Sequence, residues 1–176
     1  ESLILFIREQ LHDPKALAMI FDGLTDVNED VRVQAIKLLE AVGPIPEVLE
    51  GLANSLDDVD PEVREAARAT LVRGGERTVN ILGATVAGSR PQARLEATRT
   101  LGEMGSKAHD ALKKALGSDD LAVRVEAALL LGEQDQAEAV PVLIEAIDSV
   151  RESERNRVLN SPVSYTHLTL PTILRV

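Results

Sequence analysis

The sequence predicts an all-α protein: an α-solenoid in which antiparallel helix pairs stack into a right-handed superhelix. Two observations lead to this prediction. A short pattern recurs four times, about thirty residues apart, and the apolar residues within each copy are spaced by three or four, as on one face of a helix. The chain has 176 residues, of which 44% are hydrophobic, so it is long and apolar enough to form a packed array rather than a disordered segment.

Each copy of the pattern is centred on an arginine near the start of the first helix of a pair. The arginines are 32, 30 and 30 residues apart, namely Arg32, Arg64, Arg94 and Arg124. The residues at one position before, three after and seven after each arginine share one helical face. They are Val31, Ala35 and Leu39; Val63, Ala67 and Leu71; Ala93, Ala97 and Leu101; and Val123, Ala127 and Leu131. We expect this face to be buried, with the alanines allowing a neighbouring helix to approach closely.

The sequence also predicts where these first helices begin and end. Four residues before the arginines stand Asn28, Asp60, Arg90 and Asp120, of which three are good N-caps, and Pro61 and Pro91 follow at the first helical position. Eleven residues after the first three arginines stand Gly43, Gly75 and Gly105, where a left-handed residue is expected to end the helix. The fourth repeat differs, because it has Asp135 at this place and Gly132 earlier.

A second amphipathic helix is predicted after each of these turns. Its apolar positions are Val48, Leu49, Leu52 and Leu56; Val79, Leu82 and Val86; Ala108, Leu112 and Leu116; and Val140, Leu143, Ile144 and Ile147. Gly83 is a departure inside one of these helices, and Pro141 fits only in the first turn of its helix. An irregular helix pair, residues 3–11 and 16–24, is expected before the repeats, broken at Asp13-Pro14.

We therefore expect one repeat array over residues 1–160, followed by a tail. The repeats span about 1–25, 26–56, 57–87, 88–117 and 118–148, and a further one starts at 149–160. Residues 163–172 resemble the translation of a transposase adapter used in sequencing libraries, so residues 161–176 are interpreted as a non-native tail. The chain begins at Glu1, so we expect it to be a fragment of a longer protein.

The recurring Val-Arg-x-x-Ala-x-x-x-Leu with a closing glycine resembles the short HEAT-like repeat, the variety also found in phycobilisome-lyase proteins. This resemblance covers residues 1–160. It implies that acidic turn residues and the repeated arginines form a structural ladder between repeats. The ladder residues are Asp26, Arg32, Asp58, Arg64, Arg94, Asp119 and Arg124. The resemblance also implies that the second helices line the inner side of the superhelix. It leaves function open, because such repeats serve many purposes.

No catalytic residue, cofactor or metal site is predicted, so we expect a protein that is not an enzyme. The chain has no cysteine, no His-Glu dipeptide and no phosphate-binding loop. Residues 26–30 read Asp-Val-Asn-Glu-Asp, like the start of a calcium loop, but Val31 and Lys37 stand where glycine and glutamate are needed. The apolar run at residues 3–7 is too short to span a membrane. The net charge of −10 argues against nucleic acid as a partner.

The preferred functional hypothesis is a scaffold that docks a protein or peptide along the second-helix surface. The residues predicted to face solvent there are Glu47, Glu50, Asn54, Thr78, Thr85, His109, Lys113, Glu138 and Glu145. The alternative is an enzyme, or enzyme subunit, of phycobilin-lyase type that binds a bilin; a DNA-binding solenoid is a third class, disfavoured by charge. We also expect self-association through an exposed apolar face near residues 150–159, where the last repeat is cut short.

Overall fold

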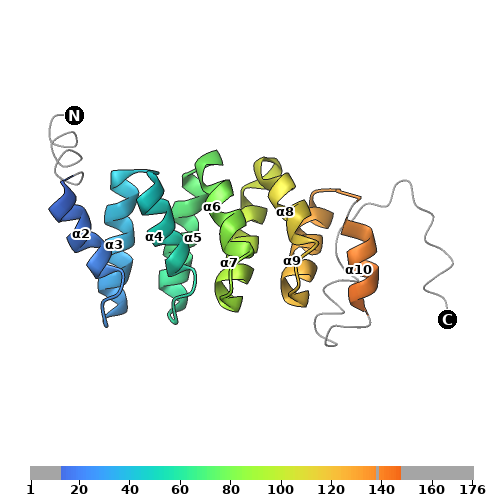
Figure 1. Ribbon diagram of the computed structural model, residues 1–176, viewed down its shortest axis with the longest axis horizontal. Coiled ribbons are helices and arrows are strands. Elements are labelled where there is room, and N and C mark those ends of the chain that lie inside the picture. The colour runs from blue at the N-terminus through green and yellow to red at the C-terminus, as the bar shows by residue number, and fades with distance from the viewer. Residues whose placement is uncertain (1–12, 138, 148–176) are drawn as a thin grey trace.

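The computed structural model describes residues 13–137 and 139–147, and all the regular structure in them is helical (Figure 1). The α-helices, in chain order, are α2 (Pro14–Gly23), α3 (Glu29–Val42), α4 (Pro46–Ser55), α5 (Pro61–Arg73), α6 (Glu76–Val86), α7 (Pro91–Glu103), α8 (His109–Ala115), α9 (Leu121–Glu133) and α10 (Ala139–Ile147). A 3-10 helix, η1 (Gly105–Ala108), precedes α8 and takes up the first turn of that second helix. The irregular first helix expected at residues 3–11 lies outside the described residues.

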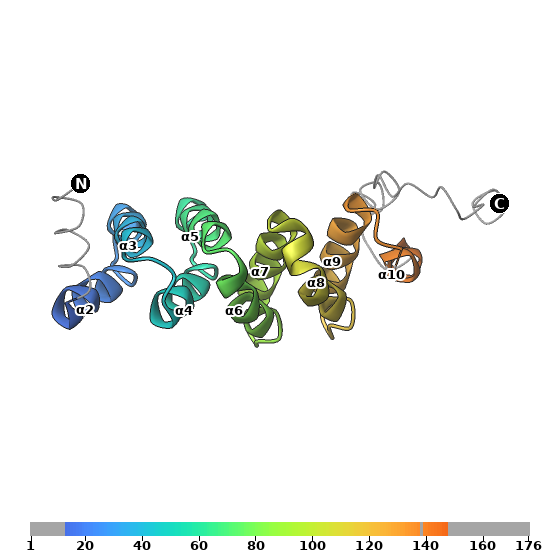
Figure 2. The same ribbon diagram turned by 90° about the horizontal axis from the view of Figure 1, so that it is seen from above.

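The helices form an elongated array of two layers, as expected for an α-solenoid. Figure 2 shows α3, α5, α7 and α9 in one layer and α2, α4, α6, α8 and α10 in the other. Successive first helices pack on one another, and so do successive second helices from α4 to α8. In Figure 1 the turns within pairs lie along the upper edge and the turns between pairs along the lower edge.

The predicted face of the first helices forms the core. The repeated leucines (Leu39, Leu71, Leu101 and Leu131) are completely buried, and the repeated alanines are at most 4% exposed. Val63, Ala93 and Val123 are also buried, whereas Val31 is 40% exposed. The difference has a structural reason: Val31 is in the first described first helix, and no earlier described first helix packs beside α3. The prediction of a buried residue at that position is therefore wrong for Val31.

The helix starts follow the capping residues of the sequence. The side chains of Asn28, Asp60 and Asp120 accept hydrogen bonds from backbone N–H groups of the first turns of α3, α5 and α9. Arg90 makes no such bond at the start of α7. Pro141 lies in the first turn of α10, where its missing N–H is tolerated.

The turns within pairs share one left-handed residue. Gly43, Gly75 and Gly105 have φ values of 103°, 66° and 63°, and Asp135, at the same place in the fourth repeat, has φ 58°. Asp135 is the only described non-glycine residue with a positive φ. The turn within each pair thus requires a residue with positive φ even where the sequence has no glycine. A residue with a side chain adopts this φ at a steric cost.

We predict that the chain with Asp135→Gly is more stable than the chain with Asp135→Ala, by about 1 kcal/mol, because only glycine adopts positive φ freely. Both variants lose the carboxylate, so the comparison isolates the backbone. The measurement is the free energy of unfolding in urea. Lys37, exposed within α3, is the control position. There the variant with alanine should be more stable than the variant with glycine by about 1 kcal/mol. If glycine or alanine were the more stable residue at both positions, this explanation would be contradicted.

Candidate functional site

Arg32 ties two successive repeats together. Its Nε and Nη2 donate to the two carboxylate oxygens of Asp58 at 2.8 and 2.9 Å, and its Nη1 donates to the carbonyls of Asp26 and Val27. The side chains of Arg32 and Asp58 are only 10% and 11% exposed. The hydrogen bonds from Arg32 to Asp58 raise the pKa of the guanidinium, so Arg32 stays charged.

The next repeats vary this arrangement because the turn residue that aligns with Asp58 changes. For Arg64 the aligned residue is Gly88, which has no side chain to accept a bond. Arg64 bonds its own turn through the carbonyls of Asp58 and Val59, and its Nε lies 4.0 Å from Glu96. The contact of Arg64 with the following repeat is therefore to Glu96 in α7 and not to a turn residue.

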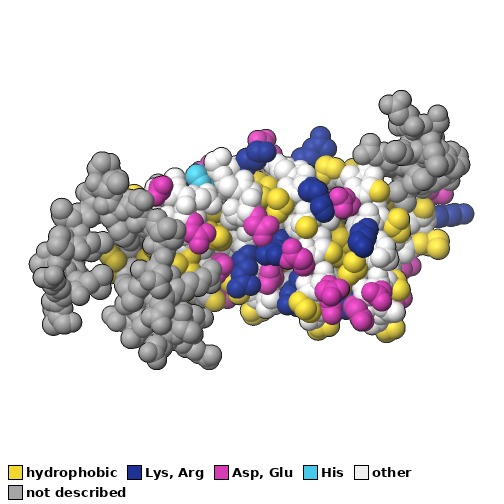
Figure 3. Space-filling view, turned by 180° about the vertical axis from the view of Figure 1, so that it is seen from behind, with side chains coloured by type: hydrophobic (Ala, Val, Ile, Leu, Met, Phe, Trp, Pro, Cys, Tyr) yellow, Lys and Arg dark blue, Asp and Glu magenta, His cyan; other side chains and the backbone are white. Residues whose placement is uncertain are grey.

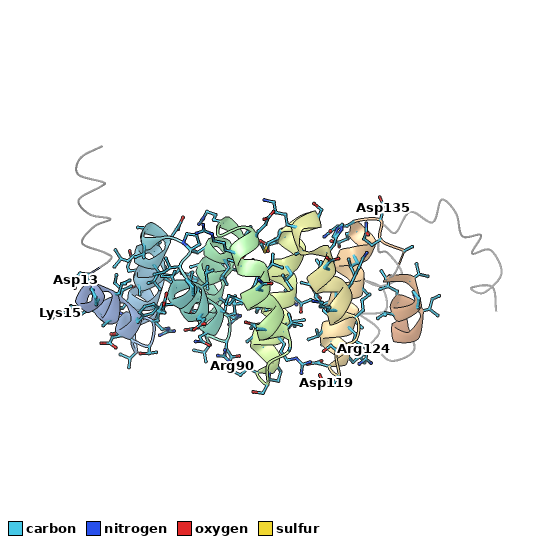
Figure 4. The ribbon with its side chains drawn as sticks, turned by 45° about the horizontal axis from the view of Figure 1, so that its top comes forward. Asp13, Lys15, Arg90, Asp119, Arg124 and Asp135 are labelled. Atoms are coloured by element: carbon cyan, nitrogen blue, oxygen red, sulfur yellow. The ribbon has the colours of Figure 1, made fainter. Side chains whose placement is uncertain are left out.

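For Arg94 the aligned residue is Ser118. Nη2 of Arg94 donates to Ser118 Oγ at 2.6 Å and to the carboxylate of Asp119, and this hydrogen bond lowers the pKa of Asp119. Arg124 bonds the carbonyl of Ser118 in its own turn. Figure 4 shows Arg90, Asp119 and Arg124 along one edge of the array and Asp135 on the opposite edge. Asp26 contributes its carbonyl to Arg32, while its carboxylate accepts from the N–H of Asn28.

A second set of ion pairs crosses the first-helix layer, and the sequence analysis missed it. Glu96 and Glu126 are 8% and 5% exposed although they are charged. Arg99 donates to both, at 3.0 and 3.3 Å, and so connects α7 to α9. Each of these glutamates stands two residues after a repeated arginine. This recurring position is the feature of the sequence that could have predicted them.

Further ion pairs join the other first helices. Arg73 pairs with Glu40 between α5 and α3, and Arg68 pairs with Glu103 between α5 and α7, each at 3.0 Å. Figure 3 shows this face, on which Lys and Arg side chains alternate with Asp and Glu. The charges of the first-helix layer thus largely serve contacts between repeats.

The residues predicted to form a partner surface on the second helices do not all face solvent. Glu47 and Glu50 are exposed on α4. Thr78 is completely buried, so its prediction is wrong: at the start of α6 it donates to the carbonyl of Gly75 and meets Met104 of the next pair. Thr85 and Lys113 are half-buried, and Thr85 Oγ1 donates to the carbonyl of Ile81.

Two of the other predicted surface residues are engaged with neighbouring repeats. Asn54 is exposed, but its side-chain oxygen accepts from Arg90 Nη2 at 2.8 Å. His109 is half-buried, with its Nε2 against the side-chain oxygen of Gln134 at the end of α9. Glu138 lies outside the described residues, and the side chain of Glu145 is not among those described. The expected apolar face at residues 150–159 also lies outside the described part of the chain.

Two grooves open on the second-helix surface, one on each side of α6. The groove between α4 and α6 has a volume of about 440 Å³, and Glu50, Thr85 and Arg90 contribute to its lining. The groove between α6 and α8 is larger, about 790 Å³, and its lining includes Gly83, Arg94, Lys107, Asp110 and Lys114. Among the described residues, no aromatic side chain lines either groove.

The described residues contain no cluster of three or more metal-ligating side chains. In the calcium-like segment, oxygens of Asp26 and Asn28 accept backbone hydrogen bonds within the turn. A search of residues 13–137 and 139–147 found no helix with the length and apolar character needed to cross a membrane.

The match to a protein-family model agrees with this architecture. A model of HEAT repeats matches residues 3–72 and 79–161. Among solved structures, the chain is similar to an engineered protein (20% identity, 89% of this chain and 81% of that chain, TM-score 0.42). It is also similar to a designed armadillo repeat protein in complex with the peptide (KR)4 (18% identity, 86% and 82%, TM-score 0.44). A third similar structure is human deoxyhypusine hydroxylase in complex with glycerol (19% identity, 90% and 83%, TM-score 0.43). The comparison with curated proteins gave no match.

The stacked helix pairs and the repeated arginine and leucine positions define an α-solenoid repeat protein. Because the family model matches more than half of the chain, the protein belongs to the HEAT-repeat family.

We predict that Arg32→Ala lowers the free energy of unfolding by about 2–4 kcal/mol, since it leaves the mostly buried Asp58 carboxylate without its partner. Arg64→Ala should cost less, about 1–2 kcal/mol, because it mainly loses bonds to carbonyls. Arg73→Ala is the matched control: its ion pair with Glu40 is half exposed and should contribute about 0–1 kcal/mol. Chemical denaturation measures all three, and equal losses for Arg32 and Arg73 would contradict the ladder role of Arg32.

Proposed function

We propose that this protein is a non-catalytic scaffold that docks a segment of another protein along its second-helix surface. The repeat fold supports this, because a stack of helix pairs offers a long surface instead of one central cavity. The observation that carries the proposal is the division of charge between the two faces. First-helix charges pair across every junction from α3 to α9, through Arg73–Glu40, Arg68–Glu103 and Arg99–Glu126.

Several charges on the second-helix surface remain available for a partner. Glu47, Glu50, Lys107 and Lys114 form no ion pair with any other described residue. The two acidic residues lie on α4, whereas the two lysines lie on η1 and α8. Such a pattern suits a partner with complementary charges, which raises association rates and sets the register of docking.

A bilin-binding role of phycobilin-lyase type has weaker support from the two grooves. A bilin needs an extended apolar cleft with cationic anchors for its propionates. The groove between α6 and α8 has cations, but the described residues that line it include no aromatic side chain to stack on the pigment. Mixing the protein with a bilin and recording the absorption spectrum separates the two functions, and the scaffold proposal expects no red-shifted, retained colour.

The test of docking is selection of short random peptides displayed on phage, followed by measurement of their affinity for charge-reversed variants. Glu50→Lys and Lys114→Glu change the second-helix surface, and at least one should weaken the selected peptides about tenfold or more. Lys37→Glu and Glu133→Lys change exposed positions on first helices and should have effects below about twofold. Absence of enriched peptides, or greater losses from the first-helix variants, would contradict the proposal.

A further inference from the structure

The larger groove contains a glycine that the fold does not need. Gly83 lies in the middle of α6, where glycine is a poor helix former compared with alanine. A Cβ atom at this position would meet nothing within 4 Å, and the φ of Gly83 is not positive. Packing and backbone conformation therefore give no reason for glycine here. Such a Cβ would instead occupy the groove, which indicates that Gly83 leaves space for close approach of another molecule.

The arginine in the same groove also departs from the other repeats. Arg32, Arg64 and Arg124 each donate through Nη1 to the carbonyl six residues earlier, in their own turn. Arg94 makes no such bond to Gly88, and instead its Nη2 reaches Ser118 and Asp119 in the next turn. Nε of Arg94 is buried and has no hydrogen-bond partner among the described residues. Arg94 thus lines the groove and still has donor capacity, since a guanidinium carries five N–H groups.

The remaining charges of the groove favour an anionic occupant. Lys107 and Lys114 are exposed, and neither forms an ion pair with another described residue. The two acidic side chains in the lining are Asp110 and Asp119, and Asp119 already pairs with Arg94. The carboxylate of Asp119 is 86% exposed, so it can leave Arg94 at little cost to packing. This cationic groove belongs to a chain whose net charge is −10.

We propose that the groove between α6 and α8 binds an acidic segment of a partner protein in extended conformation. The backbone of the segment lies over Gly83, one of its carboxylates replaces Asp119 on Arg94, and Lys107 and Lys114 contact further carboxylates. The planar guanidinium suits a carboxylate because it offers paired donors. This inference rests on the proposed docking function and names both the chemistry of the partner and the place where it binds.

The test uses the peptides selected on the intact chain, with affinity measured by fluorescence anisotropy. The selected peptides should be enriched in Asp and Glu. Gly83→Ala should weaken them about tenfold or more by filling the groove, while it raises the Tm by about 2–4 °C because alanine favours the helix. A loss of binding with a gain in stability cannot come from damage to the fold.

Two further variants sharpen the test. Asp119→Asn should strengthen binding severalfold, because it removes the carboxylate that competes for Arg94. Ala41→Leu is the matched control, since Ala41 is exposed on the first helix α3 and lines neither groove, and the affinity should stay within about twofold. Millimolar succinate should not displace the peptide, which separates a peptide site from a site for small dicarboxylates.

The outcomes separate this inference from the proposed function. Two results would overturn the acidic-segment site without contradicting the scaffold function. In the first, the peptides depend on Lys114 or Glu50 but lack acidic residues. In the second, they bind the Gly83→Ala variant as tightly as the intact chain. Displacement by succinate would also overturn it. Absence of any enriched peptide would overturn the scaffold function itself.

Discussion

The structure depends on the burial of each helix pair by its neighbour. The first helices present Ala and Leu on one face, and these residues are almost completely buried from α3 to α9. A single helix pair has too little apolar surface to offset the conformational entropy of ordering it, so adjacent pairs must cover one another. Val31 and Ile144, near the two ends of the described array, are 40% and 50% exposed, as expected where the described stack ends.

Polar contacts add a regular order to this apolar stack, but they are not identical from repeat to repeat. Arg32 holds Asp58 with two hydrogen bonds, whereas Arg94 reaches Ser118 and Asp119. Buried ion pairs contribute less to net stability than their number suggests, because both partners lose their hydration. Their effect here is to connect adjacent helices in one register. On the second-helix surface, Glu50 and Lys114 form no ion pair with another described residue and remain available to a partner.

The period of the sequence predicted the fold well because helix faces, caps and turn glycines are local properties. The left-handed residue at Asp135 could not be read from residue type, since only the alignment of the repeats places it with Gly43 and Gly75. The site was predicted less well, because exposure depends on the neighbouring pair. Thr78 has a polar side chain and yet is buried, and Arg94 departs from its own turn although its local sequence resembles the other repeats.

The central claim is that each pair is stabilised by the next, and shortening the array tests it most directly. Chains that end at Gly117 and at Ala87 lack, respectively, the last pair and the last two pairs of described helices. The account predicts that the free energy of unfolding in urea falls at each step, with a smaller dependence on denaturant because less surface is buried. A chain ending at Ala87 that unfolds at the same urea concentration as the intact protein would contradict it.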